Sequence, residues 1–190
     1  MAWFFTDENI TSDTYVISGE NARHISKSLR MKKGEELTLV TPDNTQCECV
    51  LTEITAEYSA VKITEKRPCE NEPDVFVTLY QALPKGDKMD YIVQKCVELS
   101  ISRIVPMLSA RCVSRPDAKS IKKKCERWQK IALQAAMQSR RGIIPQVCDC
   151  VSFEKAAQMS LESEKQIIFY ELGGETVTQI LDTQPQRIAM

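Results

Sequence analysis

The sequence contains no run of about 18 apolar residues, which excludes a membrane-spanning helix of ordinary length. Its "MAWFF" start also lacks the basic segment and the long apolar segment of a secretory signal. We therefore expect a cytoplasmic protein without a membrane partner. At 190 residues, 43% of them apolar, the chain can build a real core in one domain or in two small ones.

Glycine-rich phosphate loops are missing as well. Neither G-x-G-x-x-G nor G-x-x-x-x-G-K-[ST] occurs among the six glycines of the chain. Their absence counts against a Rossmann dehydrogenase and against a P-loop nucleoside triphosphatase.

Histidine is nearly absent, whereas there are eight cysteines. A chain of this length without an export signal does not need a disulfide framework. Cys47/Cys49 and Cys148/Cys150 are C-x-C pairs, which on a strand place both sulfurs on one face. A zinc site built from both pairs would lack the usual C-x2-4-C spacing, and His24 is the only histidine. We predict reduced, buried or half-buried thiols and no metal.

Positive charge is concentrated in one stretch. Ten basic and two acidic residues lie between Arg111 and Arg141, so a local charge of +8 occurs in a chain of net charge −1. Such segregation favours a polyanionic partner, because lysine and arginine neutralise phosphates and release counterions. The alternative is a solvated helix face, where most lysine-rich runs are found.

Residues 1–70 have the alternating pattern of short strands. "ELTLV" and "CECVLTEI" are separated by the turn sequence "TPDN", and "SAVKITEK" is a third alternating run. One helix is predicted at about 20–30, with Ala22, Ile25 and Leu29 at helical spacing. Short strands around one helix predict a small barrel or a half-open sandwich. The polar stretch "KRPCENEPD" that follows is predicted to be a linker.

From residue 74 the pattern alternates between strand and helix. Strands are predicted at 75–83, 103–108, 143–150 and 166–171, and helices at 85–99, 120–140 and 153–161. A short helix in "GGETVTQIL" and a strand starting at "RIAM" complete the series. This succession of βαβ units predicts a mostly parallel α/β sheet in residues 74–190. No turn, cap or polar tail closes the last strand, so we expect this domain to be incomplete as it stands.

Charged residues gather at both ends of the predicted helix 85–99. Residues 85–88 lie between a strand end and the helix start, where open α/β sheets usually bind ligands. Glu98 lies near the helix C-terminus, which is unfavourable for a carboxylate, so we expect it to pair with a nearby Lys or Arg or to belong to a site. The stripe predicted to face the sheet is Met89, Ile92, Val93, Cys96 and Val97.

Residues 120–140 are predicted to form a long amphipathic helix. Trp128 lies on its apolar stripe, and we interpret it as a core anchor rather than a platform for base stacking. Gly142, just beyond the helix, is a usual stop signal. Gln138, Ser139 and Arg141 form the kind of polar cluster that contacts a phosphate or a base edge.

Four sequence blocks together resemble a known family. They are "HISKSLRMKKGEELTLV" (24–40), "ALPKGDKMDYIVQKCVELSI" (82–101), "IVPMLSARCV" (104–113) and "RWQKIALQAAMQSRRGIIP" (127–145). In this order they are similar to the RsmE family of ribosomal RNA methyltransferases, over nearly the whole chain. The resemblance implies an α+β protein of two domains. A PUA-like RNA-binding β-barrel would occupy residues 1–70, and a SPOUT-type α/β domain with a trefoil knot would occupy residues 74–190.

The same resemblance implies a reaction and a set of site residues. Family members are homodimers that transfer a methyl group from S-adenosylmethionine to N3 of a uridine in the 16S ribosomal RNA of the small subunit. Arg111 and Arg141 match positions where positive charge would stabilise the anionic base or hold a phosphate, and no metal is required. RNA contacts are expected from Arg30, Lys85, Lys88, Arg115, Arg127, Lys130 and Gln138. The cofactor pocket is expected to include Tyr170, Glu171 and Leu172.

The sequence departs from the family pattern at three places. Ser100 stands where the family usually has glycine, and Met137 where it commonly has glutamate. The G-P-E-G-G loop and the L-G-x-R-I-L-R-x-E-T-A segment of the family, which thread the knot and hold the cofactor, do not occur in these 190 residues. We therefore expect a shortened version of a longer methyltransferase, without the C-terminal knot segment. An RNA-binding protein without catalysis stays open as an alternative, and a small-molecule α/β enzyme is a weaker one.

Overall fold

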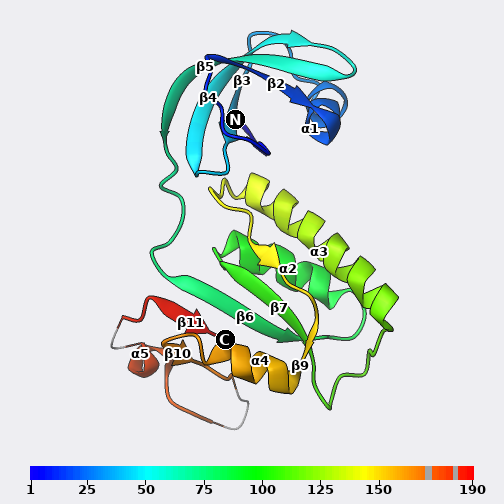
Figure 1. The fold of residues 1–190 in the computed structure, drawn as a ribbon, viewed down its shortest axis with the longest axis vertical. Helices are drawn as coiled ribbons and strands as arrows, with labels where there is room; N and C mark the ends of the chain where they lie inside the picture. The colour runs from blue at the N-terminus through cyan, green and yellow to red at the C-terminus, as the bar shows by residue number, and fades with distance from the viewer. Residues whose placement is uncertain (170–172, 182–183) are drawn as a thin grey trace. The chain divides into compact units, whose positions relative to one another are not determined.

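The computed structural model describes residues 1–169, 173–181 and 184–190. The chain folds into two units (Figure 1). The N-terminal unit comprises Met1–Glu72 together with Arg140–Ile143, and the second unit comprises Pro73–Ser139 and Ile144–Met190. Within the described ranges, no helix is long and apolar enough to cross a membrane.

The N-terminal unit is built on a five-stranded sheet with the order β1-β3-β4-β5-β2. Its strands are β1 (Ala2–Phe5), β2 (Thr14–Ser18), β3 (Glu36–Val40), β4 (Thr45–Ile54) and β5 (Tyr58–Pro68). β1 and β3 are parallel, and the other neighbours are antiparallel. The strands form a half-barrel with β1 and β2 at its edges, which confirms the PUA-like fold expected from the sequence.

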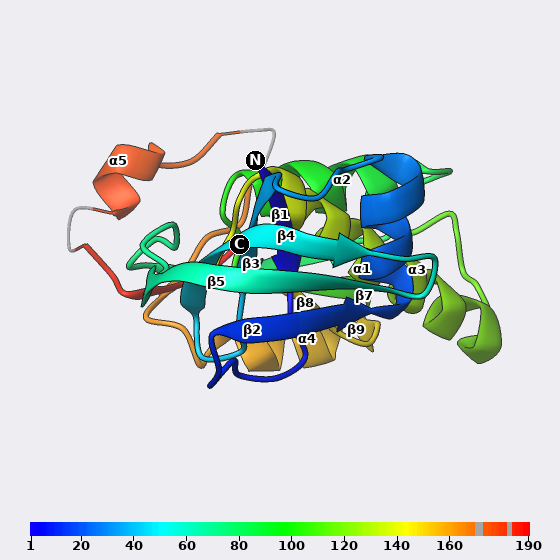
Figure 2. The same ribbon diagram turned by 90° about the horizontal axis from the view of Figure 1, so that it is seen from above.

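One helical segment lies at an end of this sheet (Figure 2). It begins as α1 (Gly19–Arg23) and continues as a π-helix over His24–Ser28. Ala22 and Ile25 are fully buried, but Leu29 is 44% exposed. The helical segment expected at about 20–30 is confirmed, but Leu29 does not share the buried face of Ala22 and Ile25, because the wider π-turn rotates later residues away from the face set by a 3.6-residue period.

The boundary between the two units, at Glu72 and Pro73, lies within the linker predicted at residues 66–74, but the first residues of that stretch belong to the N-terminal unit. The first three residues of the stretch extend β5, where Arg67 and Pro68 are in register with Gln46 and Thr45. Cys69 is buried in a cluster with Trp3 and Val40. The polar composition indicated a linker, but these residues complete the long β4–β5 pair and pack on the N-terminal core.

The second unit contains a parallel sheet with the order β10-β11-β6-β7-β8, and β9 also pairs with β7. Its strands are β6 (Phe76–Ala82), β7 (Arg103–Leu108), β8 (Gln146–Val147), β9 (Val151–Ser152), β10 (Lys165–Gln166) and β11 (Arg187–Ala189). All neighbouring strands of this sheet are parallel within the described residues, which confirms the α/β prediction. β11, formed by the "RIAM" segment, lies between β10 and β6.

Helices cover both faces of the parallel sheet. α2 (Lys88–Glu98) and α3 (Ala118–Gln138) lie side by side on one face, and α4 (Phe153–Ser160) lies on the other (Figure 1). A short helix, α5 (Val177–Ile180), follows later in the chain. The apolar stripe of α2 buries Met89, Val93 and Val97 as expected. Trp128 of α3 is 2% exposed, so its interpretation as a core anchor is confirmed.

Two predicted strands are much shorter than expected. Of residues 143–150 only Gln146 and Val147 form a strand, because residues up to Ile143 belong to the N-terminal unit. Cys148 and Cys150 therefore lie outside a strand, whereas Cys47 and Cys49 do share the buried face of β4. β10 ends at Gln166. Residues 167–169 of the predicted strand 166–171 are therefore not part of a strand, and residues 170 and 171 lie outside the described residues.

All eight cysteines are free thiols, either buried or half-buried. In the part of the chain that the structure describes, no group of three or more His, Cys, Asp or Glu side chains is arranged to hold a metal ion.

Candidate functional site at the carboxyl edge of the parallel sheet

The loops that follow β6 and β7 meet at one edge of the parallel sheet. The backbone N–H of Leu83 donates to the carbonyl of Met107 at 3.0 Å, which joins the two strand ends. β7 and β8 continue the sheet on one side of β6, while β11 and β10 lie on the other side. Ligands of open α/β sheets bind outside the carboxyl ends of strands where the strand order reverses, so this edge is the candidate site.

The β6–α2 loop is exposed and cationic. Gly86 has a φ of +71°, a left-handed conformation that glycine adopts without steric cost. Lys85 and Lys88 flank this turn, and neither forms an ion pair with another described residue. Asp87 precedes the helix but its side chain caps no backbone N–H. The loop thus presents two ammonium groups next to the strand end.

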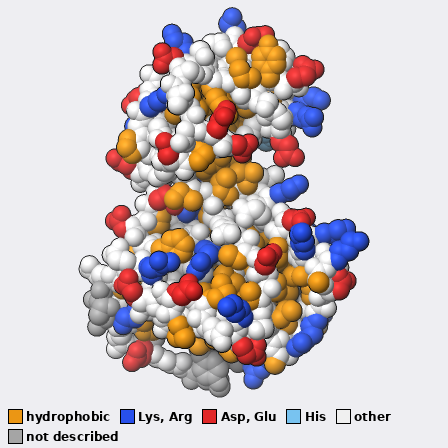
Figure 3. Space-filling model, in the orientation of Figure 1, with side chains coloured by type: hydrophobic (Ala, Val, Ile, Leu, Met, Phe, Trp, Pro, Cys, Tyr) orange, Lys and Arg blue, Asp and Glu red, His pale blue; other side chains and the backbone are white. Residues whose placement is uncertain are grey.

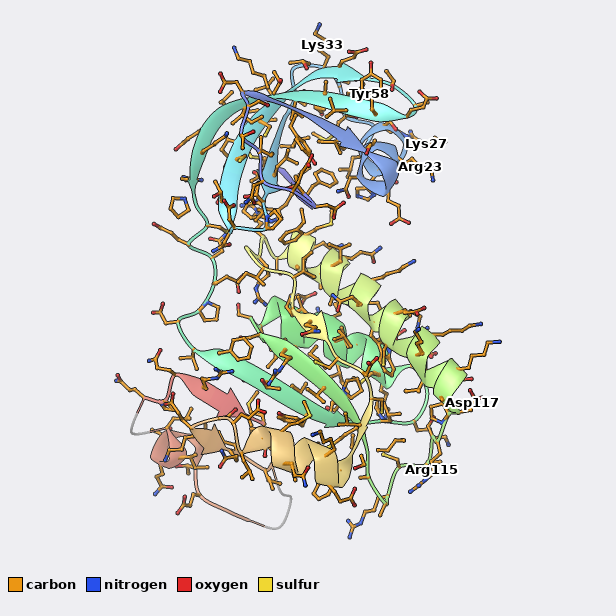
Figure 4. All side chains as sticks on the ribbon, viewed as in Figure 1. Arg23, Lys27, Lys33, Tyr58, Arg115 and Asp117 are labelled. Carbon is orange, nitrogen blue, oxygen red and sulfur yellow. The ribbon has the colours of Figure 1, made fainter. Side chains whose placement is uncertain are left out.

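The β7–α3 loop places two arginines at the same edge. Arg111 is exposed, and no ion pair restrains it among the described residues. Arg115 donates to the carbonyls of Ser109 and Ala110 at 3.2 and 3.1 Å, so its guanidinium closes the loop. Figure 4 labels Arg115 beside Asp117, the residue that caps α3 by accepting from the Ser120 backbone N–H at 2.8 Å. Arg111 is therefore the arginine of this loop that is free to meet a ligand.

A buried thiol lies beneath this loop. Burial, the largest influence on Cys112, raises its pKa, but hydrogen bonds from Ser109 and from the Leu83 backbone, together with the charge of Arg115, lower the pKa overall. The Ser109 backbone N–H lies 3.3 Å from the Cys112 sulfur. The loop is thus held from within by contacts that also favour the thiolate form of Cys112.

α3 carries most of the positive charge that the sequence concentrates in one stretch. Arg127 forms an ion pair with Asp90 at 2.7 Å, and the Trp128 indole N–H donates to the same carboxylate oxygen at 2.9 Å. Among described residues no ion pair involves the other basic residues of the helix, Lys119, Lys122, Lys123, Lys124 and Lys130. In Figure 3, Lys and Arg side chains gather along the edge of the second unit where α3 begins.

At the C-terminal end of α2, two side chains donate hydrogen bonds to the Glu98 carboxylate. The Lys95 ammonium donates to one carboxylate oxygen at 2.6 Å, and the Gln94 amide donates to the other at 2.9 Å. These hydrogen bonds lower the pKa of Glu98. The expectation that a nearby cation pairs with Glu98 is confirmed.

Arg141 is found in a different environment from the other predicted site residues. It is 2% exposed, and its guanidinium donates to both carboxylate oxygens of Glu72, at 2.8 and 2.5 Å, within the N-terminal unit. Its backbone carbonyl accepts from the Trp3 indole N–H at 2.9 Å. These contacts give Arg141 a structural function, and a catalytic function for it stays a prediction.

The remaining predicted residues are placed as follows. Gln138 is exposed in the last turn of α3, and Arg30 is exposed after the π-helix with a φ of +53°. Tyr170, Glu171 and Leu172, predicted to line the cofactor pocket, lie outside the described residues.

A second basic segment, in the N-terminal unit, was not singled out by the sequence analysis except at Arg30. Residues 21–34 contain five basic and no acidic side chains. Figure 4 labels Arg23, Lys27 and Lys33 around the helical segment and the strands beside it. All five are exposed, and no ion pair involves them in this unit, which is described without gaps. A count of basic and acidic residues in short windows along the whole chain would have found this surface.

Comparison with known proteins agrees with both units. Residues 70–190 match the family model of the RNA methyltransferase domain, and residues 17–64 match the RNA methyltransferase PUA domain. The chain is 35% identical over 158 residues to ribosomal RNA small subunit methyltransferase E of Bacillus subtilis, a match that covers 83% of this chain and 62% of that protein. It is 28% identical over 184 residues to the protein of the same name from Buchnera aphidicola, covering 96% and 71%.

A solved structure has a similar fold. The structure of a ribosomal RNA small subunit methyltransferase E from Neisseria gonorrhoeae, bound to S-adenosyl methionine, is 28% identical and superposes with a TM-score of 0.86. The match covers all of this chain and 78% of that one. The chain thus spans 62% to 78% of the length of these relatives. With a family model matched over residues 70–190 and relatives of one name along its length, this chain belongs to the RsmE family of RNA methyltransferases.

Proposed function

We propose that this protein takes part in the S-adenosylmethionine-dependent methylation of N3 of a uridine in 16S ribosomal RNA of the small subunit. The observation that carries the proposal is the RNA methyltransferase domain match over residues 70–190, whose carboxyl sheet edge presents unpaired cations. The names of the Bacillus and Buchnera relatives support a small-subunit RNA substrate. A ribosomal substrate would place the reaction in the cytoplasm, and we expect a homodimer.

The proposed RNA contacts follow the distribution of cations. Lys85, Lys88 and Lys130 are exposed and free of ion pairs among described residues, so they can neutralise phosphates without losing an internal contact. Gln138 offers an amide for a base edge. Arg127 already pairs with Asp90, and Arg115 already donates to carbonyls of the β7–α3 loop. Each arginine would therefore contact RNA only with the guanidinium N–H groups that these contacts do not use.

Arg111 is the proposed catalytic cation. Attack by N3 requires that the uridine lose its N3 proton, and a nearby positive charge stabilises the resulting anion. The exposed guanidinium of Arg111 stands at the carboxyl edge, on the loop that contacts the β6 strand end. There it can orient the base and stabilise its anionic form, while the contacts of Arg115 and Cys112 fix the loop backbone that carries it.

The residues after β10 fit the cofactor that the family implies. Ile167 is buried, but Ile168 and Phe169 are 84% and 69% exposed at the carboxyl end of β10. Apolar side chains at this edge suit the face of an adenine ring, and the proposed walls Tyr170, Glu171 and Leu172 come next in the sequence. When bound, S-adenosylmethionine supplies the methyl group on its sulfonium sulfur.

A methyl-transfer assay tests the proposal. The 190-residue protein is incubated with methyl-labelled S-adenosylmethionine and small-subunit RNA, and the digested RNA is analysed for N3-methyluridine. Label in that nucleoside would support the proposal, and Arg111→Ala should then lower the rate about 100-fold with RNA affinity changed much less. A protein that binds RNA but neither binds the cofactor nor transfers label would instead support the RNA-binding alternative.

A further inference from the structure

The two helices on one face of the parallel sheet enclose a groove, and Gln138 is the one proposed RNA contact that lines it. It has a volume of about 370 Å³, within the range of roughly 300–1,000 Å³ of small-molecule sites. α2 contributes Tyr91 and Gln94, and α3 contributes Ile131, Gln134, Ala135 and Gln138. Figure 1 shows the two helices side by side over the sheet.

The groove combines an exposed ring with unpaired amides. Tyr91 is 65% exposed although it lies beside the apolar floor formed by Ile131 and Ala135. The side-chain amides of Gln134 and Gln138 have no hydrogen-bonding partner among the described residues. An amide offers a donor pair and an acceptor, and a tyrosine offers a flat apolar face.

A polar network on α2 fixes one side of the groove. Gln94 donates its amide nitrogen to Glu98 at 2.9 Å, which turns its carbonyl oxygen away as a free acceptor. Lys95 donates to the same carboxylate at 2.6 Å, and its ammonium lies 5.9 Å from the centre of the Tyr91 ring. The Gln94 amide is therefore held before any ligand arrives, which reduces the entropy lost on binding.

The charge around the groove indicates the kind of ligand. No Lys or Arg lines it, and Asp87 and Asp90 do, so its interior does not suit a phosphate. Asp90 is already paired with the Arg127 guanidinium and also accepts a hydrogen bond from the Trp128 indole N–H. Cations stand next to the lining positions in sequence, with Lys88 after Asp87 and Lys130 before Ile131. A ligand with an anionic backbone and an uncharged, flat, hydrogen-bonding group matches this arrangement.

We propose that the groove between α2 and α3 binds an unpaired base of the RNA, stacked on Tyr91 and hydrogen-bonded by Gln134 and Gln138. Unstacked bases are commonly recognised in this way, on an aromatic ring with amides at their edges. The inference rests on the proposed RNA substrate and adds a contact that selects single-stranded RNA beside the reacting uridine.

Two probes of equal charge separate base recognition from phosphate binding. A fluorescently labelled single-stranded RNA decamer and an abasic ribose-phosphate decamer are titrated into the 190-residue protein by anisotropy. We expect the wild type to bind the base-bearing decamer at least about tenfold more tightly, because stacking of one base contributes about that factor or more. Tyr91→Ala and the double variant Gln134→Ala/Gln138→Ala should each remove most of this preference and leave binding of the abasic decamer unchanged.

Control variants make the result specific. Gln158→Ala changes an exposed glutamine of α4 and should leave both affinities unchanged. Thermal midpoints should match the wild type, because Tyr91 and Gln134 are exposed. If wild type binds both decamers equally, or the groove variants weaken both equally, base recognition in the groove is refuted while RNA binding stands. If neither decamer binds, the proposed RNA substrate fails together with this inference.

Discussion

Two parts of one basic stretch have opposite environments. The lysines of α3 are solvent-facing, and none forms an ion pair with a described residue. Arg141, three residues beyond the end of that helix, is 2% exposed and bonded to Glu72. Arg140–Ile143 are counted with the N-terminal unit, whereas α3 belongs to the second unit. Local charge density therefore does not separate cations that bind a partner from cations that stabilise the fold.

The difference follows from what surrounds each cation. A lysine on an exposed helix face keeps its hydration and gains little from a surface partner. Arg141 has lost its hydration, so the bidentate carboxylate of Glu72 must replace it. One oxygen of Glu72 also accepts from the backbone N–H groups of Gly142 and Ile143 at 2.8 and 3.1 Å. Glu72 thereby fixes a segment that lies about 70 residues away in sequence.

Removal of Glu72 should give the largest effect. Glu72→Ala leaves the Arg141 charge buried without a partner, which costs about 3 kcal/mol of the free energy of unfolding. Urea unfolding is followed by Trp3 fluorescence in a Trp128→Phe background, because Trp3 bonds to the Arg141 carbonyl and the chain has only two tryptophans.

A double-mutant cycle identifies the cause of that loss. Glu72→Ala and Arg141→Ala together should cost at least about 1 kcal/mol less than the sum of the single changes. The exposed pair of Arg67 and Glu48, at 3.4 Å, is the matched control and should show a coupling below about 0.5 kcal/mol. Equal couplings in both pairs would contradict the contrast between buried and solvated cations.

Gly142→Ala should have the next largest effect. A Cβ atom at this position would lie 2.2 Å from the Asn44 Oδ1 atom and 2.8 Å from the Cys69 sulfur. Both neighbours are packed within the N-terminal unit, so we expect a loss of about 1–3 kcal/mol in the free energy of unfolding. Ile143→Ala changes the adjacent, 51% exposed residue and should cost less than about 1 kcal/mol. Equal losses would show that the close packing at Gly142 is not the cause.

The sequence predicted those features that depend on local periodicity. The strand at 103–108 was located without error, and α3 was located to within two residues, because each has a strong apolar repeat. The core role of Trp128 followed from the same repeat. The cationic loop at residues 85–88 was placed at the carboxyl end of a strand because it lies between a strand and a helix in the predicted alternation.

Features that depend on distant contacts could not be predicted in this way. No periodic signal indicates that Arg140–Ile143 would join the N-terminal unit, so the strand at 143–150 was overextended. The polar residues before Pro73 indicated a linker, although Glu72 has its partner 69 residues away. The π-helix after Arg23 likewise has no sequence period of its own, so the helical spacing of Leu29 does not reveal its exposure.

Changes in the α3 lysines should affect RNA affinity and not stability. Lys122→Gln/Lys123→Gln/Lys130→Gln removes three charges without an internal partner among the described residues, so the free energy of unfolding should change by less than about 0.5 kcal/mol for each. The slope of log affinity against log salt should become shallower by about 0.7 for each lost phosphate contact. Lys155→Gln on α4 is the control. An unchanged slope would mean that these lysines form only a solvated face.

Two thiols in different environments should change the free energy of unfolding in opposite directions at alkaline pH. Burial raises the pKa of Cys49 from 9.0 to about 12. Above pH 9 the unfolded chain loses this proton while the folded chain keeps it, so stability falls between pH 9 and 12, by at most about 1.4 kcal/mol per pH unit. Cys112 has the opposite sign, because its lowered pKa makes the folded thiol ionise first and stability rises with pH up to 9.

Lysine and tyrosine also titrate at alkaline pH, so two cysteine variants are needed to isolate the contribution of each thiol to stability. The free energy of unfolding is measured from pH 7 to pH 10.5 for wild type, Cys49→Ala and Cys112→Ala, and the difference from wild type is plotted against pH. Cys49→Ala should flatten the alkaline decline, and Cys112→Ala should remove the gain that precedes pH 9. Two differences of the same sign would show that the hydrogen bonds of the β7–α3 loop do not outweigh the burial of Cys112.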